Sequence, residues 1–218
     1  MTGIGHIMRD SKSPIARTGD DRPRSPEDAP APSWLPWLPW LVCGWTLPYA
    51  AYRTYYALGG TAGMFGTPVS RDQWRFINGV AALLLVLTAA LAALSPLLRK
   101  SPRARAIFTG VGWLIAVGCV MHALVDEATR VLSLAGVVYL EYPVFAVIDR
   151  RAADLQDIFL NEPWFFVEGL LWGTLCWSAL RSAAARRRFA ASAAVAIALL
   201  TIVGILSSTG IIGRYIVG

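Results

Sequence analysis

Four ionisable residues lie within nine positions near the end of an otherwise apolar run, CVMHALVDEATRVLSLAG (residues 119–136). Because residues 122, 126 and 130 are four apart, a helix would place His122, Asp126 and Arg130 on one narrow stripe. Asp126 precedes Arg130 in the order that favours an ion pair, and Glu127 can share the same arginine. Groups of this kind relay protons, bind polar lipid headgroups or perform general acid–base chemistry.

A further carboxylate, Glu168, lies in the apolar stretch FFVEGLLWG. A lone carboxylate among large apolar side chains must be protonated, or must meet a cation or a hydrogen-bond donor from another helix. We expect Arg53 or Arg130 to supply that cation. The alternative for His122 is a hydrogen-bonded core histidine, and the three charged residues after it could equally mark the solvated end of a helix.

Metal binding is the weaker interpretation of these residues, and we predict neither a metal nor a cofactor. His122, Asp126 and Glu168 would form a set of one histidine and two carboxylates, but the other histidine, His6, lies in a polar tail. The three cysteines lie singly inside apolar segments and form no CxxC pair, which is typical of small core residues. The sequence contains no P-loop, GxGxxG, GxSxG or HExxH motif.

The segments that must position these residues are strongly apolar. Hydrophobic residues make up 56% of the 218-residue chain and charged residues 16%, with a mean hydropathy of +0.50, whereas a soluble domain carries about 25% charged residues. The net charge of +6 comes from short basic runs between apolar segments, which is typical of cytoplasmic membrane loops. We therefore predict an integral membrane protein with membrane lipids as partners and no nucleic-acid partner.

Five apolar segments, each near the ~20 residues that cross a bilayer, predict an all-α polytopic bundle of five transmembrane helices. They cover about residues 37–58, 75–98, 106–128, 163–181 and 190–212. These spans form one domain, residues 34–218, after a polar tail of residues 1–33 that we predict to be disordered. In DRRAADLQDIFL, Ala152, Leu155 and Phe159 recur at helical intervals and predict a short amphipathic helix on the outer surface.

The loops orient this bundle, because they alternate between rich and poor in Lys and Arg. This alternation puts the N-terminus in the cytoplasm and the C-terminus outside. Apart from the basic residues of the cytoplasmic loops, the ionisable residues within or beside a span then fall on the outer side, which predicts one outward-facing polar cavity for a small or lipidic ligand. The candidate ligand-binding residues are Tyr52, Arg53, Asn78, His122, Asp126, Glu127, Arg130 and Glu168, and the candidate catalytic residues are His122, Asp126 and Glu168.

Residues 34–212 resemble a group of uncharacterised multi-pass membrane proteins of high-GC bacteria in the stretches YRTYYALGG, MHALVDEATRVLSLAG and NEPWFFVEGLLWG. The chain has a histidine followed four residues later by a carboxylate, and a glutamate in a later helix that contains Trp. This pattern is distantly similar to the emopamil-binding (sterol isomerase-like) family. That resemblance implies a lipid-binding cavity with proton transfer by His122, Asp126 and Glu168 near Trp172. The chain departs from the family in helix count and lacks its fuller motif.

Three functions stay open from the sequence. The first is a non-enzymatic membrane protein whose outer polar cluster binds a small or lipidic ligand or stabilises the bundle. The second is a membrane-embedded, lipid-modifying enzyme with isomerase-like acid–base chemistry at His122 and the carboxylates. A transporter or accessory subunit comes last, because the chain lacks visible inverted repeats. Nearly all basic residues are Arg, and Ala and Gly are abundant, so we expect the cytoplasmic (inner) membrane of a bacterium.

Overall fold

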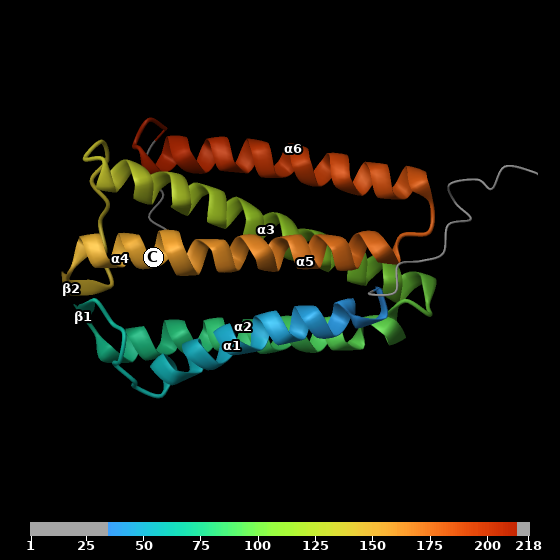
Figure 1. Ribbon diagram of the computed structural model, residues 1–218, viewed down its shortest axis with the longest axis horizontal. Coiled ribbons are helices and arrows are strands. Elements are labelled where there is room, and N and C mark those ends of the chain that lie inside the picture. Colours follow the sequence, from blue (N-terminus) through green and yellow to red (C-terminus); the bar gives the residue numbers. More distant parts are fainter. Residues whose placement is uncertain (1–34, 213–218) are drawn as a thin grey trace, which may run out of the picture. The chain divides into compact units, whose positions relative to one another are not determined.

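The computed structural model of the protein describes residues 35–212. The tail predicted to be disordered, with His6, lies outside the described residues. Within them the chain is mostly helical, and five long helices lie side by side (Figure 1). They are α1 (Leu38–Ala57), α2 (Arg71–Leu98), α3 (Pro102–Leu134), α5 (Glu162–Ala179) and α6 (Ala183–Ser208).

The all-α prediction is confirmed, and several helices extend beyond the apolar runs that define the predicted spans. α6 begins at Ala183 rather than near residue 190, since the Ser182 side chain accepts a hydrogen bond from the backbone N–H of Ala185. Ser101 caps α3 in the same way, and the helix continues through its polar residues to Leu134. With 33 residues, α3 is about 50 Å long.

Three of the five helices, α2, α3 and α6, are long and apolar enough to cross a membrane by length and composition. These helices indicate a membrane protein. The same criteria leave out α1 and α5, whose sequences are rich in Trp and Tyr or in Trp and Glu. The prediction of five transmembrane helices is therefore supported for three of them.

One end of the bundle carries the short elements (Figure 1). Strand β1 (Gly66–Pro68) pairs antiparallel with β2 (Phe145–Ile148), a small ribbon that the all-α prediction missed. Helix α4 (Arg150–Gln156) occupies the segment predicted to be a short amphipathic helix, and a π-helical turn (Asp157–Asn161) joins it directly to α5. The ribbon and this continuous connection hold the two long loops of this end together.

Helix α3 packs closely against α5 in the interior. Trp172 and Cys176 are fully buried there. A Cβ atom at Gly112 would lie 2.0 Å from the Cys176 Sγ, and one at Gly169 would lie 2.6 Å from a methyl group of Val120. Glycine is therefore required at both contacts, as expected for helices whose backbones approach closely.

Helix α6 is held less firmly than the other helices. It packs mainly against α3, and Ser207 is its one buried residue among those described. It approaches α3 closely at Gly204, where a Cβ atom would lie 2.5 Å from a methyl group of Val125, and Trp113 of α3 donates a hydrogen bond to the Ser192 hydroxyl at 3.2 Å. The rest of α6 exposes apolar side chains, as a lipid-facing helix does.

Candidate functional site

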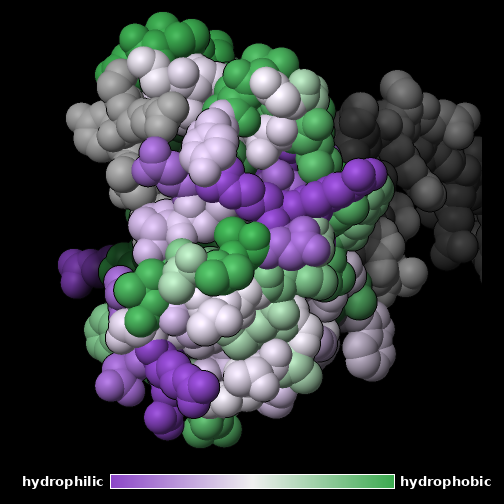
Figure 2. Space-filling model, turned by 90° about the vertical axis from the view of Figure 1, so that its left-hand side faces the viewer, coloured by the Kyte–Doolittle hydropathy of each residue, from purple (hydrophilic) through white to green (hydrophobic). Residues whose placement is uncertain are grey.

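Arg130 is the centre of a charged cluster at the end that carries α4. Its guanidinium lies 3.2 Å from Asp154 Oδ1, 3.0 Å from Asp157 Oδ2 and 3.9 Å from Asp126 Oδ2. The three carboxylates come from α4, the π-helical turn and α3, so the cluster joins α3 to the segment that precedes α5. Figure 2 looks onto this end, where a band of hydrophilic residues crosses the surface between apolar regions.

Asp154 is the most buried member of this cluster, with 2% of its surface exposed. Its carboxylate accepts hydrogen bonds from Arg130, from the Ser133 hydroxyl at 2.9 Å and from the Tyr142 hydroxyl. Burial, together with the hydrogen bond to Asp154, raises the pKa of Tyr142. Burial also raises the pKa of Asp157, although Arg130 opposes this shift. Tyr142 therefore keeps its proton and donates it in a hydrogen bond to Asp154. Burial disfavours the ionised form of Asp157.

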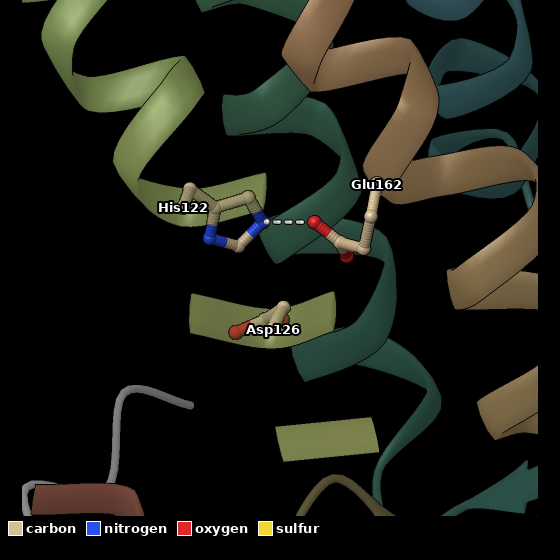
Figure 3. Close-up of side chains that lie close together, drawn as sticks. All are labelled: His122, Asp126 and Glu162. Carbon is tan, nitrogen blue, oxygen red and sulfur yellow. Dashed lines mark ion pairs between the residues drawn. The ribbon is translucent and has the colours of Figure 1, made fainter. Parts of the chain in front are cut away.

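About two turns before Arg130 on α3, His122 faces Glu162 of α5 (Figure 3). The His122 Nε2 lies 3.8 Å from Glu162 Oε2. Glu162 is buried, with 4% exposed, whereas 46% of the His122 side chain is exposed, and Phe165 presents its ring edge-on to the imidazole. One ligand atom each from His122, Asp126 and Glu162 lie within 4.8 Å of one another.

Glu168 lies apart from this group, in the interior between α1 and α5. Its Oε1 accepts hydrogen bonds from the Thr46 hydroxyl at 2.6 Å and from the Trp172 indole at 3.0 Å. Six residues separate it from Glu162, or about 9 Å along the helix axis. The expected ion pair of Glu168 with Arg53 or Arg130 was wrong: hydroxyl and indole donors reach Oε1 instead, and Oε2 is buried with no hydrogen-bond partner in the described part of the chain.

Arg53 belongs to a separate polar group on α1 and α2. It donates to Asn78 Oδ1 at 3.1 Å and to the Tyr49 hydroxyl at 2.7 Å. The neighbouring Tyr52 hydroxyl accepts a hydrogen bond from Gln156 of α4 at 2.9 Å. Tyr52 and Arg53 line a small pocket of about 180 Å³, whose opposite side includes Arg130.

A larger groove of about 530 Å³ lies between α3, α6 and the loop after α3. His122, Asp126 and Arg130 form its polar part. Its apolar walls include Val125 of α3, Leu140 and Pro143 of the loop, and Leu200 and Val203 of α6. The groove thus has a polar and an apolar part, which is the pattern that an amphipathic ligand requires.

The residues predicted to share one cavity are divided between these two spaces. Arg130 lines both of them, whereas Asn78, Glu127 and Glu168 line neither. The sequence reasoning missed Glu162 as a partner of His122. One signal could have found it, because a glutamate at the first turn of the α5 segment falls on the same outer side as His122.

The sequence analysis also did not identify Asp154, Asp157 and Tyr142 as partners of Arg130. The length of the connection between α3 and α5 could have indicated these roles. A long connection with helical periodicity has to cross the end of the bundle, where it can contact α3.

Comparisons with known proteins add no relative: no family model matches the chain, and neither a curated protein nor a solved structure matches it. The chemistry of the site follows from its side chains. Three carboxylates surround Arg130, so this cluster disfavours anions and favours cations. A histidine beside a buried carboxylate can pass a proton or hold a metal ion.

Proposed function

We propose that this chain is a multi-pass protein of a bacterial inner membrane that binds a lipidic ligand in the groove between α3 and α6. The observation that carries the proposal is the groove itself. Its apolar walls accommodate an acyl or isoprenoid chain, and its polar part carries His122, Asp126 and Arg130. The excess of carboxylates there favours a headgroup with an amine or another hydrogen-bond donor over a bare phosphate.

In this proposal all five long helices cross the bilayer, with the α4 end outside. α1 and α5 cross beside the three more apolar helices, and the 18 residues of α5 reach about 27 Å, close to the ~30 Å of hydrocarbon. The α2–α3 and α5–α6 connections lie together at the opposite end (Figure 1). The basic residues at that end are Arg99, Lys100, Arg103, Arg105, Arg181, Arg186, Arg187 and Arg188. This concentration supports a cytoplasmic position for that end.

The length of α3 supports an interfacial position for the polar part of the groove. A helix of about 50 Å exceeds the hydrocarbon thickness by about 20 Å. If its basic start lies at the inner surface, Asp126 and Arg130 reach the outer headgroup layer and His122 lies just below it. A lipid could then enter sideways, with its tail along α6 and its headgroup at the charged residues.

Filling the groove tests this proposal. Val203→Trp puts a large ring into the apolar wall, and Ile202→Trp is the matched control, because Ile202 is also exposed on α6 but does not line the groove. We expect the wild type and I202W to retain bound lipid after purification in detergent, as read by native mass spectrometry, and V203W to lose it. Equal lipid content in all three proteins would refute the proposal.

A second candidate is a lipid-modifying acid–base enzyme, favoured by the position of His122 beside Glu162 at the groove. Glu162 would then take the part that the resemblance to the emopamil-binding family gives to Glu168. The variants His122→Gln and Glu162→Gln distinguish the candidates. If the protein is an enzyme, the wild type converts a lipid of a membrane extract, and the two variants still bind lipid but no longer convert it. If it only binds lipid, neither the wild type nor the variants convert any lipid.

A further inference from the structure

We infer that His122, Asp126 and Glu162 bind a divalent transition-metal ion of the Zn²⁺ class beside the α3–α6 groove. The three side chains offer one imidazole nitrogen and two carboxylate oxygens, all within 4.8 Å of one another. Zinc binds nitrogen and carboxylate oxygen donors of this kind. Catalytic zinc sites have three protein ligands and leave a fourth position open for water or substrate. Figure 3 shows the His122 ring directed at Glu162 of α5, with Asp126 close to both.

The distances suit an ion between the two helices. The His122 Nε2 and the Glu162 Oε2 are 3.8 Å apart. An ion placed about 2.1 Å from each of them would have a nitrogen–ion–oxygen angle of about 130°. Two donors of one such ion can be at most about 4.2 Å apart, so the Asp126 carboxylate completes the set with a shift of a few tenths of an ångström. A rotation of an aspartate that is only half-buried provides that shift.

Glu162 supplies an independent sign of a ligand. It is 96% buried, because 4% of its side chain is exposed, and its Oε2 faces His122 without accepting a hydrogen bond in the described part of the chain. A buried carboxylate oxygen without a donor costs free energy, which binding to a cation would offset. The imidazole alone offsets little of this cost, since 3.8 Å exceeds hydrogen-bond length.

The charges around the site also favour a cation. Four carboxylates, Asp126, Asp154, Asp157 and Glu162, lie near one guanidinium, that of Arg130. Arg130 is closest to Asp154 and Asp157, and is 3.9 Å from Asp126, so the Asp126 oxygens are only weakly neutralised. A divalent ion would balance the remaining negative charge at the place where His122 adds a nitrogen donor.

The open positions of the ion would face the groove, because 46% of the His122 side chain is exposed there. Water or an oxygen of a groove ligand could occupy them. Metal binding itself does not require that a lipid occupies the groove. It can therefore be measured in detergent without added lipid, and its outcome is distinct from that of the lipid-binding test.

The experiment measures Zn²⁺ binding to tag-free protein after treatment with a chelator. The chain has two histidines, so a His6→Ala background removes the other imidazole. We compare H6A with H6A/H122Q, H6A/E162Q and H6A/D126N by isothermal titration calorimetry, and record the visible spectrum of the Co²⁺ form. Glu127→Gln in the same background is the matched control, since Glu127 lies beside Asp126 but outside the set.

We expect one Zn²⁺ per chain in H6A and in its E127Q variant, with an increase in Tm. We expect at least tenfold weaker binding in H6A/H122Q and H6A/E162Q, and an altered Co²⁺ spectrum in H6A/D126N. Absence of stoichiometric binding in H6A would overturn the inference, as would unchanged affinity in H6A/H122Q. Because His122 is exposed, its variant is expected to fold, and size-exclusion chromatography verifies this; if E162Q fails to fold, H122Q alone decides.

Discussion

The buried carboxylate of Asp154 should contribute more to stability than that of Asp157, although both pair with Arg130. Asp154→Ala removes the acceptor of three hydrogen bonds, from Arg130, Ser133 and Tyr142. Asp157→Ala removes one ion pair at 3.0 Å and one hydrogen bond from Asn161 at 2.6 Å. Each variant leaves Arg130 with the other aspartate, so the comparison isolates the surroundings of the deleted group.

The magnitudes follow from burial. Breaking a buried ion pair costs about 3–5 kcal/mol, and we take about 3 kcal/mol for Asp154→Ala because Arg130 keeps Asp157. Asp157 is 20% exposed, and its raised pKa shows that its charge is already disfavoured by burial. For Asp157→Ala we therefore expect about 1 kcal/mol. At about 2–4 °C per kcal/mol for a chain of this size, Tm falls by about 6–12 °C and 2–4 °C respectively.

The assay is a thermal melt in one detergent, followed by circular dichroism at neutral pH and low salt. Wild type, D154A and D157A are prepared in parallel, and monodisperse samples are confirmed by size-exclusion chromatography. Equal decreases in Tm for the two variants would refute the reasoning, because the cluster would then behave as an exposed ion-pair network. A larger decrease for D157A would reverse the assignment of the dominant partner.

Three further predictions concern other parts of the chain. Gly112→Ala should destabilise the α3–α5 contact by about 1–3 kcal/mol through overpacking, whereas Gly118→Ala, where a Cβ meets nothing within 4 Å, should leave Tm unchanged or raised. Thr46→Val should cost about 1–3 kcal/mol, because Glu168 loses its closest donor; Tm is the readout, and an unchanged Tm would contradict the hydrogen-bond assignment. Since its pKa is raised, Asp157 holds its proton more tightly in the folded than in the unfolded state. Its contribution to the free energy of unfolding therefore falls as pH rises from the ordinary aspartate range through the raised pKa, and Asp157→Asn should flatten this part of a Tm–pH profile.

The long helices could be predicted because apolar runs of about 20 residues carry their own signal. Their ends could not be placed from hydropathy alone, since serine caps at Ser70, Ser101 and Ser182 extend the helices into polar sequence. The β1–β2 ribbon was missed for a different reason. Its strands have three and four residues and lie almost 80 positions apart, so nothing local specifies their pairing.

The residues that α3 contributes to the candidate site could be predicted from the sequence, but the residue from α5 could not. The i, i+4 spacing places His122, Asp126 and Arg130 on one stripe of α3, and all three line the groove. From the second helix of the site, the sequence analysis selected Glu168, because a carboxylate among apolar neighbours needs a partner. Glu162 meets His122 instead, since the π-helical turn carries α4 directly into α5 and sets which glutamate faces α3.

The glycine contacts between α3 and α5 have a consequence for ligand size. They fix these two helices as one stiff body, and all three proposed metal ligands stand on it. α6 touches that body closely at Gly204 and otherwise contributes little buried surface. The groove therefore lies between a closely packed helix, α3, and a helix with few buried residues, α6. If the groove binds the proposed lipidic ligand, a wider ligand would be accommodated by a shift of α6, whereas the spacing of His122, Asp126 and Glu162 would be kept.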